Sequence, residues 1–393
     1  MQAAFQRWRA AAKRVPAASK LPEPRLSLGY FLSSVETRVG PQQARVSLEQ
    51  SFPWPTELSA GHDAAARAVR AAQRAFEAET VAATARAGVA YWTLWETRVA
   101  RIAHVAHLGV LEGLVESVEG RVKVGSASLA DQQQIALAAG RLEDRIQGMR
   151  ARERGAAAEL RAALGWPRDR AVPTEPTLEL GLPIEGAEAL VASAQLHPRI
   201  AQASELAESA EARARSEDAR RWPGFTVGAD WIVVGDGPSG VEDRGKDALA
   251  VGLGLKLPLW QSIYADAVEA AHADAQSYRF EARARAADVA AGVEAALAEV
   301  EDQLRRVQLY RDLLIPQAEA VVESAVGGYA VGRGSIAQLL LAQEDLLELR
   351  IAHDAALAGY ERAFVRLEAA VGRPVPRAFE PRPAPADGEL ETP

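Results

Sequence analysis

An internal repeat constrains the fold of this chain more strongly than any other feature of its sequence. Residues 122–129 (VKVGSASL) resemble residues 329–336 (YAVGRGSI), and each segment precedes a long helical pattern that contains glutamine. Both patterns end in a Gly-x-Pro sequence, at Gly165 and Gly372, 40 residues after the glycines Gly125 and Gly332. Landmarks that recur in the same order at the same spacing predict a duplicated architecture.

Proline-containing segments extend this repeat toward the start of each half. Residues 52–54 (FPW) correspond to residues 257–259 (LPL), and residues 21–24 correspond to residues 221–224. Two unrelated alanine-rich helical hairpins are the alternative explanation. On the repeat we divide the chain into a first repeat, a second repeat and a C-terminal tail: residues 1–180, 181–374 and 375–393.

Each repeat contains a long stretch that favours the helix. Residues 56–166 hold no proline and are dominated by Ala, Glu, Arg, Leu and Gln, which are good helix formers. Gly125 is the natural break, and it leaves helices of about 60 and 40 residues, the longer reaching about 90 Å. The second repeat predicts the same pair at about 260–372, with Pro316 disturbing the first helix. A shorter helix is expected at about 185–221.

Between the prolines the hydrophobic period changes to two, which predicts β-hairpins at about 25–53 and 225–257. Each strand of about 10 residues, tilted by about 40°, would cover about 25 Å, the height of the apolar band of a membrane β-barrel. Two soluble hairpins that cover a helical core are the alternative. Four strands cannot close a barrel, so strands in a membrane would require several chains to share one.

Composition narrows the class of protein further. Lys and Arg total 45 against 53 Asp and Glu, a formal net charge of −8, which does not favour nucleic acid as a partner. There is no cysteine, which excludes disulfides and thiolate metal sites. No run approaches 18 consecutive apolar residues, and Met1 opens into a polar helical pattern instead of a secretory signal. Taken alone, these two features indicate a cytoplasmic protein, whereas the predicted strands indicate a membrane β-barrel.

Candidate catalytic and metal-binding residues are sparse. His104 and His107 have the i, i+3 spacing that can bind a metal on a helix, with Glu96 and Glu112 nearby, but ordinary interhelical histidines are the favoured interpretation. The glycine-rich residues 235–240 lack the lysine and the following helix of a phosphate loop. No nucleophile–base set can be identified. The sequence therefore predicts no enzyme, no cofactor and no metal site.

As an ordered set, three motifs resemble the TolC-type outer-membrane efflux protein family. Residues 253–260 (LGLKLPLW) resemble its last strand running into a long helix. Residues 315–319 (IPQAE), followed by residues 328–332 (GYAVG), resemble the approach to its periplasmic tip. Residues 338–343 (QLLLAQ) resemble the run that returns from the tip. The resemblance covers about residues 1–374, nearly the whole chain.

The resemblance implies a mainly α fold with a membrane β-barrel contribution. Each protomer would supply four strands and a long helical part, and a homotrimer would form a 12-stranded barrel in the bacterial outer membrane and a tunnel in the periplasm. The channel would be the exit duct of a tripartite efflux pump for small molecules or metal cations. Its partners would be a periplasmic membrane-fusion adaptor, an inner-membrane pump of the RND type and outer-membrane lipid. The first hairpin looks more like the heavy-metal-efflux branch.

The resemblance also implies roles for particular residues. The adaptor-docking tips would be Val124, Gly125, Ser126, Val331, Gly332 and Arg333. The periplasmic aperture would be lined by Asp131, Gln134, Gln338 and Leu341. The lipid-facing strand would present Leu249, Val251, Leu253, Leu255 and Leu257.

The chain departs from the family in two respects, and its sequence is also consistent with two rival functions. The family normally begins with a signal peptide and a complete first helix pair, so we expect Met1 to be an internal or misassigned start. Family members often carry aspartates just past the second tip, where this chain has Gln338 and Leu341. The rival functions are the duct of a type I protein secretion system and a soluble coiled-coil scaffold.

Overall fold

The computed structural model describes residues 1–172, 180–240 and 242–378 and divides into two compact units. The first unit combines Met1–Ala78 with Pro198–Ala286, and the second combines Glu79–His197 with Ala287–Pro393. Each unit thus contains segments of both sequence repeats, so the division at residues 180 and 181 stays a prediction. Within the described ranges, no helix has both the length and the apolar character needed to cross a membrane.

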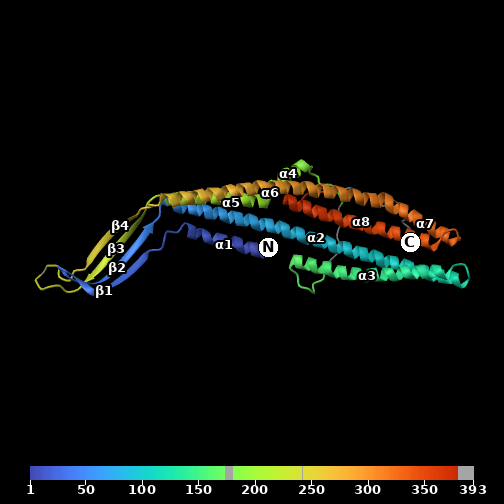
Figure 1. Cartoon of the computed structure of the whole chain (residues 1–393), viewed down its shortest axis with the longest axis horizontal. Coiled ribbons are helices and arrows are strands. Elements are labelled where there is room, and N and C mark those ends of the chain that lie inside the picture. Colours follow the sequence, from blue (N-terminus) through green and yellow to red (C-terminus); the bar gives the residue numbers. More distant parts are fainter. Residues whose placement is uncertain (173–179, 241, 379–393) are drawn as a thin grey trace, which may run out of the picture. The chain divides into compact units, whose positions relative to one another are not determined.

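A four-stranded antiparallel sheet forms one part of the first unit (Figure 1). Its strands follow the chain order β1-β2-β3-β4, so the hairpin of the first repeat pairs with that of the second through β2 and β3. The strands confirm the period-two prediction; their bounds are β1 Arg25–Thr37, β2 Gly40–Phe52, β3 Gly224–Val234 and β4 Ala248–Lys256.

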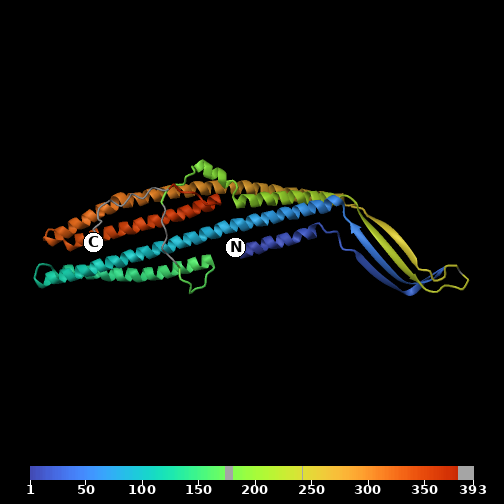
Figure 2. The ribbon, with the colours of Figure 1, turned by 180° about the vertical axis from the view of Figure 1, so that it is seen from behind.

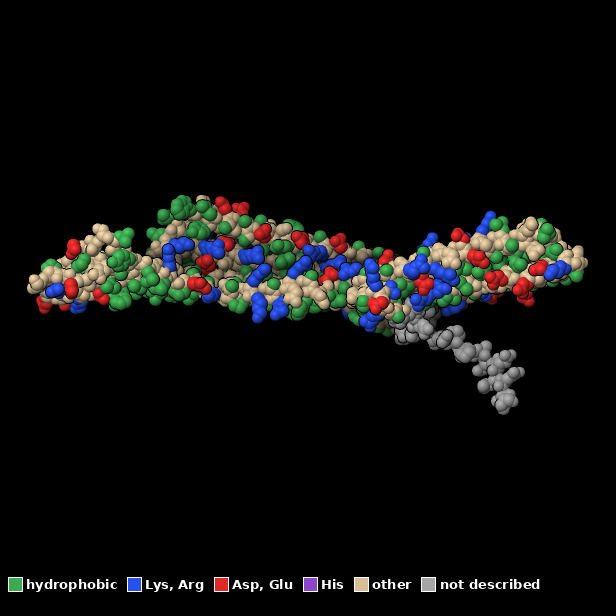
Figure 3. Space-filling model, turned by 90° about the horizontal axis from the view of Figure 1, so that it is seen from below, with side chains coloured by type: hydrophobic (Ala, Val, Ile, Leu, Met, Phe, Trp, Pro, Cys, Tyr) green, Lys and Arg blue, Asp and Glu red, His purple; other side chains and the backbone are tan. Residues whose placement is uncertain are grey.

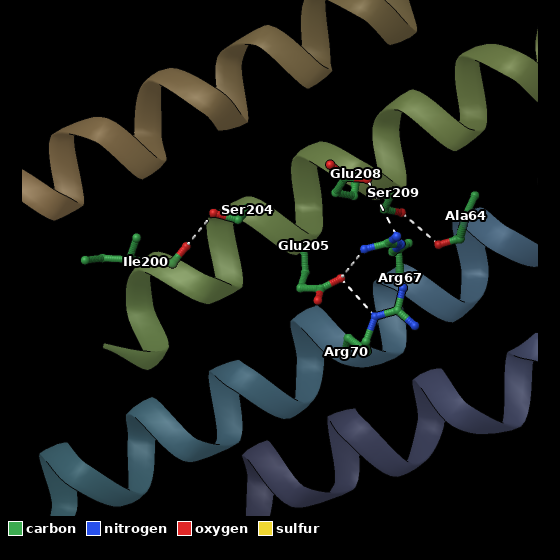
Figure 4. Close-up of polar contacts among 8 residues, drawn as sticks. All are labelled: Ala64, Arg67, Arg70, Ile200, Ser204, Glu205, Glu208 and Ser209. Carbon is green, nitrogen blue, oxygen red and sulfur yellow. Dashed lines mark hydrogen bonds and ion pairs between the residues drawn. The ribbon is translucent and has the colours of Figure 1, made fainter. Parts of the chain in front are cut away.

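Helices run on from the same end of every strand in the first unit. They are α1 Gln2–Ala18, the beginning of α2 Pro55–Lys123, α5 Pro198–Ala219 and the beginning of α6 Gln261–Leu309. Helix α5 packs through buried alanines, and Ser209 Oγ donates to the Ala64 carbonyl of α2 at 2.8 Å. Beside this bond, Arg67 and Arg70 of α2 both donate to the Glu205 carboxylate (Figure 4).

The second unit is built from two antiparallel helical hairpins (Figure 2). Helix α2 turns into α3 Leu129–Leu164, and α7 Ile315–Ala330 turns into α8 Ile336–Val371. The short helix α4 Ala187–Ala194 packs on α8. Between α6 and α7 lies the π-helix η1 Tyr310–Leu314, next to the proline predicted to disturb this helix, because Pro316 has no amide hydrogen for the regular ladder.

The core of the second unit centres on the middle of α8. Tyr360, Phe364 and Leu367 are fully buried against Leu190 of α4 and Val293 of α6. The Tyr360 hydroxyl donates to the Gly181 carbonyl at 2.7 Å and accepts from the Gly181 amide at 3.1 Å. A paired charge secures the segment after α8, because Arg377 donates twice to the Glu361 carboxylate at 2.9 Å. The linker between the repeats and the end of α8 are thereby fixed to one core.

Candidate functional site

One face of the sheet is apolar and exposed along its whole width. In β4 the alternate residues Leu249, Val251, Leu253 and Leu255 point to this face, and Leu253 keeps 79% of its surface exposed. Leu257, the fifth residue of the predicted set, lies just past the end of β4 and is also exposed. Hydrophobic side chains gather in the sheet region of Figure 3 as well.

The strand register makes this face continuous across both repeats. Leu253 is opposite Val227 of β3, and in the next strand pair Leu48 of β2 is opposite Ala229. Leu26 of β1 is in turn opposite Leu48. Single exposed hydrophobic residues are common on soluble proteins, whereas a continuous apolar surface of this kind indicates contact with lipid or with another protein.

The opposite face of the sheet is polar. Asp230 of β3 accepts hydrogen bonds from the Arg45 guanidinium, at 2.8 and 3.0 Å, and from the Ser47 hydroxyl, both on β2. Near the helices, Arg25 lies opposite Glu49. Glycines and alanines predominate on this face in β4, where a Cβ added at Gly252 would meet no other atom within 4 Å. The sheet therefore separates an apolar face from a polar one, as the wall of a membrane β-barrel does.

Aromatic side chains mark the end of the sheet that adjoins the helices. Trp54 stacks on Trp222 with ring centroids 5.6 Å apart, and Phe52 stacks on Phe225 at 5.1 Å. Trp260, just before α6, is largely exposed. Aromatic rings with one polar edge concentrate where an apolar layer meets water, so their place fits a membrane boundary.

The two predicted docking turns have the same construction. Gly125 and Gly332 adopt left-handed conformations, with φ of 76° and 73°, which glycine permits without steric cost. In each turn the preceding valine points outward: Val124 is 78% exposed and Val331 is 69% exposed. A Cβ added at either glycine would meet no other atom within 4 Å, so it is the backbone conformation that favours glycine here.

Two of the predicted aperture residues have a structural task at these turns. Asp131 accepts from the backbone amide of Ser128, and Gln338 accepts from that of Ser335, while each serine hydroxyl caps the helix that follows. This reciprocal capping fixes the starts of α3 and α8. The other two positions, Gln134 and Leu341, are exposed. Their place at an aperture stays a prediction.

Arg121 connects the two turns, and sequence reasoning missed it. Its guanidinium donates to the Ser126 carbonyl of its own turn at 3.4 Å and to the Tyr329 carbonyl at 3.3 Å. It also lies 4.6 Å from the centroid of the Tyr329 ring, a cation–π geometry. Burial raises the pKa of Tyr329, the Asp131 carboxylate raises it further, and the Tyr329 hydroxyl is buried with no hydrogen-bond partner among the described residues.

The predicted histidine pair is part of the helix packing. His104 is buried on α2 and its Nδ1 lies 2.7 Å from the Ala100 carbonyl oxygen. Burial lowers the pKa of His107, and the nearby His104 lowers it to a smaller extent. The Glu344 carboxylate acts in the opposite direction. The described part of the chain contains no group of three or more His, Cys, Asp or Glu side chains that could hold a metal ion.

The model of the family described as outer membrane efflux protein matches residues 189–373, which carry the second hairpin and the second docking turn. Residues 189–373, just under half of the chain, are therefore similar to this family. Proteins of the family are outer-membrane channels of tripartite efflux systems and are not enzymes. The predictions of an efflux channel, of an outer-membrane location and of no enzymatic activity are thereby confirmed.

Several solved structures have the same fold as this chain. The outer membrane protein VceC from Vibrio cholerae superposes with a TM-score of 0.77 at 21% identity, over 94% of this chain and 92% of that one. CusC gives 0.78 at 15% identity, over 95% and 88%. The MtrE outer membrane channel of Neisseria gonorrhoeae gives 0.72 at 14% identity, over 95% and 85%. No curated protein sequence matches the chain.

Proposed function

We propose that the chain is one protomer of a homotrimeric channel whose three sheets close into a 12-stranded barrel. The sheet has the order β1-β2-β3-β4, so among the described residues β1 and β4 each keep one edge without a strand partner. Unpaired backbone groups are not tolerated in lipid, and one sheet of four strands cannot close on itself. Three copies joined edge to edge would give every edge strand a hydrogen-bonding partner.

The apolar sheet face supports contact with outer-membrane lipid. At about 3.3 Å per residue and a tilt of about 40°, the nine residues of β4 cover about 23 Å, close to the apolar height of a membrane barrel. Leu249, Val251, Leu253, Leu255 and Leu257 then face lipid. The polar face with Asp230 and Arg45 lines the water-filled interior.

The two glycine turns support docking of a periplasmic adaptor. Channels of this family work with an adaptor and an inner-membrane pump, and we propose a pump of the RND type here. The exposed valines, Val124 and Val331, are the side chains that a partner can cover at each turn. The neighbouring residues Asp131, Gln134, Gln338 and Leu341 line the aperture, and the cargo is small molecules or metal cations selected by the pump.

The membrane assignment is tested by one pair of variants on β4. Leu253→Arg places a charge on the apolar face and costs about 2–4 kcal/mol at mid-membrane, so the protein should fail to assemble in the outer membrane. Gly252→Ser, the adjacent residue on the polar face, has open space around its new side chain and should assemble normally. Membrane fractionation measures both. Equal abundance of the two variants in the outer membrane would contradict the proposal.

A further inference from the structure

The two outermost helices of the first unit carry charges that no other part of the described chain neutralises. Helix α1 holds Arg7, Arg9, Lys13 and Arg14 and no acidic residue. All four side chains are exposed, and none makes a hydrogen bond or an ion pair with another described residue. Figure 3 shows a band of Lys and Arg side chains along the helices that adjoin the sheet.

The beginning of α6 carries unpaired charges of the opposite sign. Asp266, Glu269 and Asp274 are exposed and have no ion-pair partner within the described ranges. Basic residues in the same part of α6 do have partners: His272 and Arg279 both contact the Glu211 carboxylate of α5. The first turns of α6 are therefore acidic where α1 is basic.

These charges lie on the faces that point away from the neighbouring helices. Trp8 of α1 stacks on Phe76 of α2, and at 100° per residue Arg9 and Lys13 fall on the other side of α1. On α6, the buried Ala271 and Ala275 mark the face toward α5, whereas Asp266 and Glu269 fall on the far side together with the small residues Ala270, Ala273 and Ser277. Both free faces are accessible to a partner.

The sheet topology determines which partner meets them. Helix α1 leads into the edge strand β1, and α6 follows the opposite edge strand β4 (Figure 1). A second copy that pairs its β1 with β4 of the first copy must therefore bring its α1 beside α6. This contact uses two different surfaces, and such heterologous contacts generate a ring when the rotation between copies closes.

The charges on the two helices also lie at similar distances from the sheet. Lys13 lies five residues before the end of α1 at Ala18, and Asp266 lies five residues after the start of α6 at Gln261. At 1.5 Å per residue each is about 8 Å from the sheet end of its helix. Arg9 and Glu269 both lie about 12–14 Å from those ends.

We propose that α1 of one copy docks against α6 of the next copy, with Lys13 and Arg9 facing Asp266 and Glu269. The small residues on that face of α6 permit close approach of the helices. This proposal rests on the proposed trimer and adds the surface through which the helical parts of neighbouring protomers recognise one another. Opposite charges at matched heights would also select the correct edge of the partner during assembly.

Charge reversal with rescue tests this interface in the full-length protein in detergent. The variant Arg9→Glu/Lys13→Glu turns two attractive pairs into repulsive ones at each contact, and we expect its trimer association constant to fall by about tenfold at low salt. Adding Asp266→Lys/Glu269→Lys should restore the trimer to within about twofold of the natural protein. Higher salt should weaken the natural trimer, because it screens exposed charges.

A matched control uses α5, which lies between α2 and α6 and so has no free side toward another copy. Arg213→Glu/Arg215→Glu changes two exposed, unpaired charges there by the same amount and should leave the trimer unchanged. Suppose that the natural protein is trimeric. If the α1 variant is then equally trimeric, or if the α6 reversal does not restore the trimer, this inference is wrong and the proposed channel is unaffected. A natural protein that forms no trimer would overturn both.

Discussion

Replacing Gly332 by aspartate separates a docking role of the α7–α8 turn from a purely structural one. Gly332 has φ of 73°, and a residue with a side chain loses about 1–2 kcal/mol in this conformation. A Cβ added at Gly332 meets no atom within 4 Å, so backbone strain is the main cost of the substitution inside the chain. This cost is small against the roughly 5–15 kcal/mol of a typical fold. The variant should therefore reach the outer membrane in normal amounts.

The charge is expected to act at the docking surface. An adaptor that covers the turn would remove water from the introduced carboxylate without supplying a partner, which costs several kcal/mol and hence two or more powers of ten in affinity. Export should fall accordingly. Gly332→Ala carries the same backbone strain without the charge and should keep most of the export. Gly327→Ala, inside α7 with open space around it, should match the natural protein.

Two measurements on the same cells decide the outcome: abundance of the channel in the outer membrane, and export in the presence of the matching adaptor and pump. Normal export by Gly332→Asp at normal abundance would refute the docking role. Equal loss of export in Gly332→Ala and Gly332→Asp would assign the effect to the backbone of the turn.

Two further predictions concern the second unit. Arg377→Ala leaves the Glu361 carboxylate, 5% exposed, without its cation and should lower the free energy of unfolding by about 3–5 kcal/mol. The loss should appear as a lower unfolding midpoint in detergent. Arg373→Ala, the control, removes the exposed pair with Glu185 and should cost under about 1 kcal/mol. Equal effects would contradict this reasoning. The pKa of His107 is lowered in the folded state, so the unfolded chain binds the proton more tightly, and stability should fall as pH drops below the ordinary value of about 6.5. His107→Gln should reduce that fall between about pH 7.5 and pH 5.5, and an unchanged pH profile would contradict it.

The sequence predicted those parts of the fold that depend on local patterns. The strand alternation from Leu249 to Leu255 and the left-handed glycines at Gly125 and Gly332 follow from side-chain period and backbone preference, and the structure contains them. The capping by Asp131 and Gln338 was equally visible, because Ser-x-x-Asp and Ser-x-x-Gln stand at the helix starts. The resemblance to the family predicted aperture roles for the same two residues.

Contacts between distant segments could not be predicted in the same way. Arg45 and Asp230 are 185 positions apart, and they meet only because β2 pairs with β3 in one particular register. Alternation within a strand determines its faces and leaves its neighbour and its register open. The contact of Arg121 with Tyr329 likewise depends on how two helical hairpins lie against each other. The charges and the hydrophobic pattern of one segment do not determine where the other segment lies.

The mass of the folded protein in detergent tests the central claim most directly. A sheet with free edges at β1 and β4 requires partner strands, so native protein extracted from the outer membrane should have three times the 42.0 kDa mass of the chain. Circular dichroism on the same sample should show the β signal of the four strands. A stable monomer with that β signal would contradict the shared barrel and, with it, the channel proposed here.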